Sequence, residues 1–366
     1  WLIKGGYFGY ILHFRPGKGN NMKTVLEKIT EYDKRESRDI IEAAGKIIRE
    51  GGLVAFPTET VYGLGADASK KIYQAKGRPS DNPLIVHICC MEDLERITAY
   101  IPEKARKMAK AFWPGPLTMI FEKSKAVPLE TTGGLATVAV RMPSHPAALA
   151  LIRAGGGYVA APSANRSGRP SPTLAQHVVQ DMNGRISMIL DGGPVGIGIE
   201  STIVDFSEQI PMILRPGFIT TDMIQDVIGE VQMDPGLAAP DSQLPPKAPG
   251  MKYRHYAPKA QLILVDGVQK KVQEKIRDLV EKEIVSGKTA GIIATDESCK
   301  NYPCGIVKSI GTRSDENTIA RHLYGILREF DEMDVEIIYS ESFLTPKIGQ
   351  AIMNRMLKAA GHQVIK

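Results

Sequence analysis

Apolar and polar positions alternate with a helical period around residue 40. Ser37 is a candidate helix cap, and the apolar residues after it recur at helical spacing, at Ile40, Ile41, Ala44, Ile47 and Ile48. Gly51 and Gly52 follow directly and predict the end of the helix. The next apolar run, Leu53 to Pro57, is short and typical of a buried strand.

The pattern continues with helices and strands as far as residue 228. It predicts helices at 91–100, 102–112, 146–153 and 173–181, and strands at 117–121, 136–141, 158–161, 187–190, 202–205 and 211–214. Several of these strands follow one another directly instead of alternating strictly with helices. This order predicts an α/β fold built on a twisted, mixed, open sheet.

The composition changes between residues 229 and 260, where six prolines lie close together. Such a stretch predicts an extended linker. Beyond it, strands at 261–265, 289–294 and 335–339 alternate with helices at 268–285, 316–330 and 346–360, which is typical of a small, Rossmann-like parallel α/β domain. We therefore expect a domain at 22–228, a linker at 229–260 and a second domain at 261–366. Residues 1–21, which precede Met22 and are rich in glycine and aromatics, are interpreted as an extension.

Composition agrees with a two-domain protein of the cytoplasm. The 366 residues fit two domains of roughly 150 residues each. The net charge of +5 is too small to identify a nucleic-acid binder by itself. Four cysteines are too few for a disulfide framework and favour a reducing compartment. No apolar run approaches the roughly 20 residues that span a bilayer, so no membrane contact is expected.

The first candidate for chemistry is the glycine-punctuated turn at 56–65, which follows a predicted strand. It carries the hydroxyls of Thr58, Thr60 and Tyr62 beside backbone that a ligand can approach closely. A strand-end turn whose hydroxyls bond to one another explains the same pattern, so both interpretations stand at this point.

The second candidate is the cationic pair Lys76 and Arg78, which Pro79 and Pro83 hold on an irregular stretch. A phosphate chain needs fixed positive charge, and arginine offers a bidentate fork. A solvated basic turn would need no proline framing, so the rigidity favours an anion site. His87 ends the next apolar run and fits either a structural or a binding role.

The remaining candidates lie where other predicted strands end. The loop at 161–171 carries several hydroxyls and an amide, and it resembles an anion-binding arrangement near a helix N-terminus. Arg141 and Arg215 each end a strand, and Glu200-Ser201-Thr202 follows a glycine-hinged turn. Together these ends predict one shared polar crevice at an edge of the sheet. The sequence contains no P-loop, no dinucleotide-binding glycine turn and no serine-hydrolase elbow, so a nucleotide would need a site of dispersed basic and hydroxyl groups.

Five motifs in order resemble the threonylcarbamoyl-AMP synthase family, whose catalytic unit is the YrdC-type domain. They are Pro57-Thr-Glu-Thr-Val-Tyr-Gly, Lys76-Gly-Arg78, Pro162-Ser-Ala-Asn165, Glu200-Ser-Thr202 and Arg215-Pro-Gly217, within about residues 37 to 228. The linker sequence 248–258 resembles the two-domain form of the family. One departure is the stretch before Lys76, which is about five residues shorter than the family pattern and would cost the helix there about one turn. A true deletion would threaten the placement of Lys76 and Arg78; residues absent from this sequence would explain the gap equally well, and we favour that explanation.

The resemblance implies the synthesis of L-threonylcarbamoyl-AMP. Threonine and bicarbonate would form a carbamate, whose oxygen attacks the α-phosphate of ATP and releases pyrophosphate. The product would serve a separate transferase that modifies a tRNA adenosine beside the anticodon, and a weak direct contact with tRNA is compatible with the basic residues. The implied cofactor is Mg²⁺, which would be bound mainly by the ATP phosphates, so no metal ligand is assigned to the protein.

The resemblance also implies roles for individual residues. The threonine pocket would comprise Thr60, His87, Arg141, Ser201 and the backbone at Ala161. The ATP site would comprise Lys76, Arg78, Asn82, Thr118, Ser163, Asn165, Ser171, Arg215 and, from the linker, Tyr256. Lys76 and Arg78 would be the catalytic pair, because such a transfer depends mainly on positioning and charge neutralisation.

Three alternatives stay open at this point. An RNA-binding module of the same fold would explain the basic residues. Such a module is expected to contain more aromatic residues for stacking on bases than the 6% present. Related carbamoyltransferases carry zinc-finger-like cysteine pairs that this sequence lacks. The linker is expected either to close over the crevice as a lid or to dock the second domain through Tyr253 and Tyr256.

Overall fold

The computed structural model describes residues 23–32, 34–67, 69–237, 255–343 and 347–366. The predicted extension at 1–21 lies outside the described residues, and so do residues 238–254 of the predicted linker, including Tyr253. The lid hypothesis for that part of the linker therefore stays a prediction.

A four-stranded sheet forms one side of the larger, N-terminal part. Its strand order is β1 (Val25–Lys28), β8 (Met188–Asp191), β2 (Val54–Phe56) and β3 (Gly63–Gly65), and only β3 runs antiparallel to its neighbour. Side chains alternate between the two faces of a strand. Val54 and Phe56 therefore pack with α1 (Arg35–Arg49) and α5 (Pro146–Ala154), while Ala55 faces the cluster of α2 (Ser69–Lys76) and α6 (Ala175–Met182). Helices thus cover both faces of this sheet.

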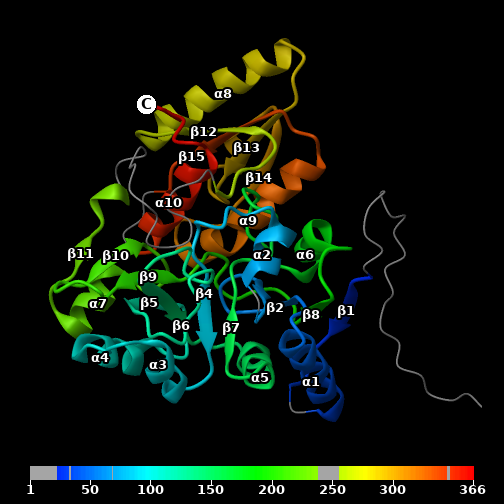
Figure 1. Ribbon diagram of the computed structural model, residues 1–366. Coiled ribbons are helices and arrows are strands. Elements are labelled where there is room, and N and C mark those ends of the chain that lie inside the picture. Colours follow the sequence, from blue (N-terminus) through cyan, green and yellow to red (C-terminus); the bar gives the residue numbers. More distant parts are fainter. Residues whose placement is uncertain (1–22, 33, 68, 238–254, 344–346) are drawn as a thin grey trace, which may run out of the picture.

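A mixed seven-stranded sheet forms the other side. Its order is β11 (Gln232–Met233), β10 (Met212–Arg215), β9 (Thr202–Asp205), β5 (Leu117–Glu122), β6 (Thr137–Arg141), β4 (Ile85–Ile88) and β7 (Tyr158–Ala160). One face packs against α3 (Met91–Ile97), α4 (Glu103–Phe112) and α7 (Thr221–Ile228), at the lower left of Figure 1. The two sheets meet where β3 approaches β7 through bridges between Gly63 and Ser163 and between Ala66 and Ala160. The opposite face of the seven-stranded sheet carries only a small apolar cluster, and this face holds the site described below.

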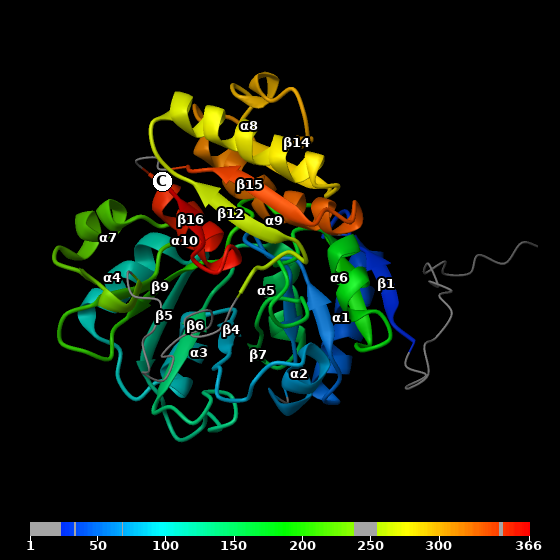
Figure 2. The ribbon, with the colours of Figure 1, turned by 90° about the horizontal axis from the view of Figure 1, so that it is seen from above.

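The C-terminal domain, which we define as β12 to β16, contains a parallel five-stranded sheet. Its order is β14 (Ile306–Ser309), β13 (Ala290–Ala294), β15 (Ile337–Glu341), β12 (Gln261–Val265) and β16 (Val364–Ile365). Helix α8 (Gln269–Val285) lies on its outer face. Helices α9 (Glu316–Glu332) and α10 (Gly349–Ala359) lie between this sheet and the N-terminal part (Figures 1 and 2). Short 3-10 turns occur at Pro235–Leu237 and Cys299–Asn301.

The predicted mixed sheet and the predicted parallel C-terminal sheet are both confirmed. The sequence pattern missed helix α7 and six strands of two to four residues each: β1, β3, β4, β11, β14 and β16. Strand β14 shows why, because all four of its residues are only half-buried at a sheet edge and form no continuous apolar run. The shortened stretch before Lys76 forms the eight-residue helix α2.

Gly198 marks a close approach of the N-terminal part to the backbone of α9. Its φ is +91°, and a Cβ atom there would lie 2.4 Å from Cα of Arg321 and 2.5 Å from the carbonyl oxygen of Ala320. A side chain at this position would therefore be strained and would also push α9 away.

We expect Gly198→Ala to lower the free energy of unfolding by about 2–4 kcal/mol, from backbone strain plus a backbone clash. Gly193→Ala is the matched control, because Gly193 has a φ of +80° and nothing within 4 Å of an added Cβ. The control should lose only about 1 kcal/mol, the cost of the left-handed backbone. Urea denaturation of both variants measures the difference, and equal losses would contradict the close packing of α9.

Candidate active site

A hollow of about 710 Å³ lies where strands of both sheets end. Its walls come from the turn between β2 and β3, from the end of α2, from β4 and from the ends of β6, β7 and β10. The segment that precedes β9 and the start of the described range 255–343 complete them. These are the strand ends from which the sequence predicted one shared crevice.

The hollow brings together most of the predicted site residues. Ten of them line it: Lys76, Arg78, His87, Arg141, Ala161, Ser163, Asn165, Ser201, Arg215 and Tyr256. The other four lie directly behind the lining, and each bonds to a residue in the wall. Thr60 bonds to Arg141, Asn82 to Arg78, Thr118 to Ser201 and Ser171 to Glu200.

Lys76 ends helix α2 and fixes the loop that follows β7. Its ammonium donates to the carbonyl oxygens of Ser163 and Asn165, and its Nζ lies 3.4 Å from Oδ1 of Asn165. Burial lowers the pKa of Lys76 well below its ordinary value, and the charge of neighbouring Arg78 lowers it further. A negatively charged ligand would relieve both effects, so this position favours an anion.

Arg78 is held in a fixed orientation by the short turn that follows it. Its guanidinium donates to Oδ1 of Asn82 at 2.5 Å and to the carbonyl oxygen of Pro83 at 3.0 Å. Burial lowers its pKa to about 10, which still leaves the group charged at neutral pH. The guanidinium of Arg78 is therefore held by hydrogen bonds within the protein, which differs from the freely solvated basic turn that was the alternative.

Arg141 ends β6 and also lines the hollow. It donates to Oε1 of Glu59 at 2.5 Å and to Oγ1 of Thr60 at 2.9 Å. Its buried Nε–H has no hydrogen-bond partner among the described residues. His87 lies nearby, and burial together with the charge of Arg141 lowers its pKa to about 3, so the imidazole is neutral at pH 7.

Glu200 is the carboxylate in the lining of the hollow, and its partners come from both parts of the chain. Oε1 accepts from Ser171 at 2.6 Å, and both oxygens accept from the hydroxyl of Tyr324, at 3.0 and 2.8 Å. Nε of Arg355, in α10, donates to Oε2 at 3.1 Å. Burial opposes the charged form, but Arg355 and Arg215 outweigh it and keep the pKa of Glu200 below its ordinary value.

His255 and Tyr256 close one side of the hollow. Tyr256 adopts a positive φ of 66°, and its ring centroid lies 5.3 Å from that of Tyr324. Burial lowers the pKa of His255 to about 3 and raises that of Tyr256. The end of the predicted linker thus contributes two uncharged, buried rings to the wall.

The comparisons with known proteins agree with this arrangement. A family model described as "Telomere recombination" matches residues 46–217, and one described as "Threonylcarbamoyl-AMP synthase, C-terminal domain" matches residues 219–361. A threonylcarbamoyl-AMP synthase of Bacillus subtilis is 51% identical over 352 residues, covering 94% of this chain and all of that protein. The solved structure of Pyrococcus abyssi Sua5 in complex with L-threonine superimposes with a TM-score of 0.88 at 46% identity, covering 94% of this chain and 99% of that one.

The chain belongs to the threonylcarbamoyl-AMP synthase family. This membership confirms the predicted family, its fold class and its nucleotidyltransferase activity. The roles of the individual residues stay predictions.

The sequence assigned no binding role to four charged or imidazole residues in or beside the hollow: Glu59, Arg169, Glu200 and His255. Glu200 and Glu59 lie inside motifs that carried the resemblance, so position in a motif was the available signal. Their partners Arg355 and Arg141 lie far away along the chain, and no local pattern reveals such pairs.

Two further observations concern metal binding and membrane spanning. Among the described residues, the one group of three that could hold a metal ion is Cys89, Cys90 and Asp93, and none of these lines the hollow. None of the described helices is both long and apolar enough to cross a bilayer.

We expect Glu200→Gln to lower the free energy of unfolding by about 3–5 kcal/mol at pH 7, because Arg355 would lose the charge that offsets its burial. The pKa of Glu200 is lowered in the folded protein, so its contribution is present above the unfolded pKa of about 4.3 and is lost as pH falls through the folded pKa. The gap between wild type and variant should therefore narrow below about pH 4.

Urea denaturation across this pH range measures the gap. Glu42→Gln is the control, since the pair that Glu42 forms with Arg49 is exposed and should contribute no more than about 1 kcal/mol. A gap that stays constant down to pH 3 would show that the charge of Glu200 does not matter.

Proposed function

We propose that the hollow makes L-threonylcarbamoyl-AMP from L-threonine, bicarbonate and ATP, with threonine near Arg141 and the ATP phosphates near Lys76, Arg78 and Arg215. The observation that carries this proposal is the presence of two cationic regions in one hollow. Arg141 lies beside Thr60 and His87, while Lys76 and Arg78 lie beside the loop of Ser163 and Asn165.

The threonine side is supported by the unused donor of Arg141. The buried Nε–H can bond a carboxylate without breaking the pair with Glu59. His87 and Thr60 are uncharged at pH 7, so they suit the amino acid's hydroxyl and the carbamate rather than a second anion. The complex of the Pyrococcus abyssi relative with L-threonine supports threonine as the ligand of this fold.

On the ATP side, the chain's own residues would position the phosphates and neutralise charge. Threonine nitrogen first bonds to the carbon of bicarbonate with loss of water, which gives a carbamate. A carbamate oxygen then bonds to the α-phosphorus, the bond from that phosphorus to the bridging oxygen breaks, and pyrophosphate leaves with its electron pair. Lys76, Arg78 and Arg215 would stabilise the negative charge on the phosphate oxygens.

A magnesium ion would fit this site with the ATP phosphates, more than protein groups, as its ligands. Glu200 is the lining carboxylate, and Ser171, Tyr324 and Arg355 already engage it. The chain would thus leave the ion to the phosphates and water, as is usual for Mg²⁺. The ion would supply further charge neutralisation.

The partners beyond the reaction itself follow from the product. An activated carbamoyl-adenylate hydrolyses in water, so a transferase that modifies tRNA adenosine must take it up promptly, and we place both in the cytoplasm.

The RNA-binding alternative receives less support, because Tyr100 is the one strongly exposed aromatic among the described residues.

The protein with ATP, Mg²⁺, bicarbonate and L-threonine should release pyrophosphate. Release should require both threonine and bicarbonate, since both provide atoms of the attacking carbamate. A coupled pyrophosphate assay with one component left out at a time measures this, and equal release without threonine or without bicarbonate would refute the proposed reaction.

We expect Arg78→Ala to lower kcat/KM for ATP by roughly ten- to a hundredfold, the cost of one charge-assisted hydrogen bond. Arg35→Ala should have no effect, because the side chain of Arg35 is 93% exposed. Arg78→Lys keeps the charge but loses the fork and should fall between the two. Near-normal kinetics in a folded Arg78→Ala protein would show that this cation does not contact ATP.

A further inference from the structure

Helix α9 of the C-terminal domain presents one polar face to the walls of the hollow. Tyr324, Arg328 and Asp331 are spaced by four and three residues, so they project from the same side of the helix. All three are almost completely buried, with exposed fractions of 0%, 2% and 4%. A helix face that buries a cation, an anion and a tyrosine hydroxyl must meet specific partners.

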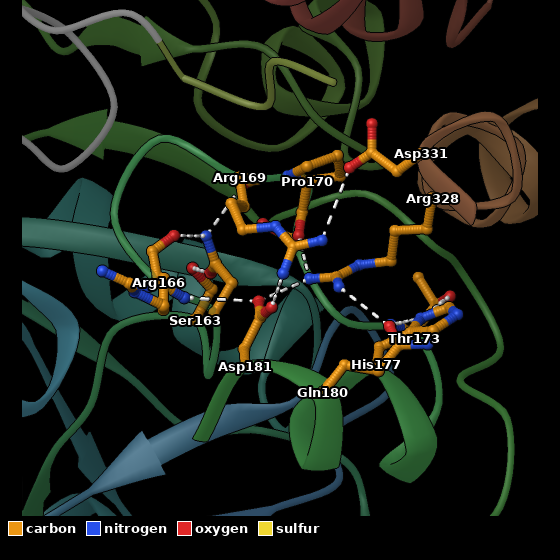
Figure 3. Close-up of polar contacts among 12 residues, drawn as sticks. Ser163, Arg166, Arg169, Pro170, Thr173, His177, Gln180, Asp181, Arg328 and Asp331 are labelled. Atoms are coloured by element: carbon orange, nitrogen blue, oxygen red, sulfur yellow. Dashed lines mark hydrogen bonds and ion pairs between the residues drawn. The ribbon is translucent and has the colours of Figure 1, made fainter. Parts of the chain in front are cut away.

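Arg328 meets the loop that follows β7 (Figure 3). Its guanidinium donates to the carbonyl oxygen of Pro170 at 2.5 Å and to Oδ2 of Asp181 at 2.8 Å. Asp181, on α6, in turn accepts from the backbone N–H of Arg166 at 3.3 Å and from the side chain of Arg169. One arginine of the C-terminal domain thus restrains both halves of this loop.

The restrained loop is the one that Lys76 holds from inside the hollow. Lys76 donates to the carbonyl oxygens of Ser163 and Asn165, and Nδ2 of Asn165 donates to the carbonyl oxygen of Arg169 at 2.8 Å. A continuous series of contacts therefore runs from Arg328 through Asp181 and Arg169 to Asn165 and Lys76. Each link joins groups whose positions would decide where phosphate oxygens can lie.

Asp331 and Tyr324 act on the neighbouring wall. Oδ1 of Asp331 accepts from the backbone N–H of Lys259 at 2.7 Å, and its Oδ2 lies 3.4 Å from Nη2 of Arg169. The ring of Tyr324 packs against that of Tyr256. The same helix face therefore holds the segment around Tyr256 as well as the loop.

We propose that α9 is a positioning element of the active site: through Arg328 and Asp331, the C-terminal domain holds loop 163–171 and the segment at Tyr256 in the geometry that ATP requires. This inference rests on the proposed placement of ATP. Arg328 and Asp331 do not line the hollow, so they act through the residues that do.

The competing explanation is that these contacts only fasten one domain to the other. Arg321 offers a control on the same helix: it is exposed, unlike Arg328, but its Nε also donates across the interface, to the carbonyl oxygen of Gly196 at 3.0 Å. No contact links Arg321 to loop 163–171 among the hydrogen bonds of the described residues. Domain fastening alone would make Arg328 matter for stability and would leave the ratio of ATP to threonine affinity unchanged; positioning makes Arg328 matter specifically for ATP.

The test compares Arg328→Met with Arg321→Met. We expect Arg328→Met to raise KM for ATP, and the Kd of α,β-methylene-ATP in calorimetry, by about tenfold, because small displacements of positioning groups are costly. The Kd of L-threonine should stay within about twofold, because Thr60, His87 and Arg141 belong to other elements. Arg321→Met should change neither affinity.

A double variant separates positioning from stability. Arg328→Met leaves Asp181 with one cation fewer, and adding Asp181→Asn removes that buried charge. The double variant should regain thermal stability without regaining ATP affinity. Asp331→Asn replaces Arg328→Met if the latter does not fold, and it should raise the Kd of α,β-methylene-ATP at least threefold while the Kd of threonine is unchanged.

Three outcomes would overturn the inference: unchanged nucleotide affinity in a folded variant, equal losses of nucleotide and threonine affinity, or recovery of nucleotide affinity together with stability in the double variant. Failure of the proposed function looks different, because then the wild-type protein would release no pyrophosphate in the presence of threonine and bicarbonate. The calorimetric affinity for α,β-methylene-ATP still tests α9 in that case.

Discussion

Positive charge concentrated in a buried hollow is the constraint on which the rest of this structure depends. Lys76, Arg141 and Arg215 are each no more than 4% exposed, and a charge taken out of water is costly unless other groups replace its hydration. Lys76 donates hydrogen bonds to backbone carbonyls, and Arg141 donates to the carboxylate of Glu59. Arg215 donates to the carbonyl oxygen of Ser201 at 3.0 Å. The groups proposed to bind substrate are therefore also the groups that hold the walls together.

The C-terminal domain takes part in this charge balance. Glu200 lies in the wall, and two of its partners, Tyr324 and Arg355, belong to α9 and α10. Arg355 also donates to the carbonyl oxygen of Glu200 at 3.2 Å and to that of Pro216, next to Arg215. The domain thus supports the ATP side of the hollow at two places, through Arg328 and through Arg355, and the fold of one domain depends on the charges of the other.

The sequence predicted those elements and site residues that have a signal in the neighbouring residues of the chain. Proline framing pointed to Lys76 and Arg78, and strand ends pointed to Arg141 and Arg215; the structure brings all four into one hollow. Arg328 gave no such signal. Its helix was predicted, but its partner Asp181 is 147 residues away, and an arginine on an amphipathic helix ordinarily indicates a solvated face. Contacts between distant, buried, charged residues depend on how the domains dock, which periodicity does not encode.

We expect buried ion pairs of this kind to contribute more to the uniqueness of docking than to its strength. When the domains are apart, Asp181, Glu200, Arg328 and Arg355 would all be hydrated, so pairing them recovers only part of what dehydration costs. Any docking that shifts α9 by one turn would leave at least two of these charges buried without partners. The apolar cluster on the adjacent side of α9, with Leu323, Leu327 and Phe330, can supply the favourable free energy, but apolar contacts alone tolerate sliding. The charges exclude the shifted arrangements, and the register that they select is the one in which the segment at Tyr256 bonds to loop 163–171, with the backbone N–H of Ala257 donating to the carbonyl oxygen of Gly168 at 2.9 Å.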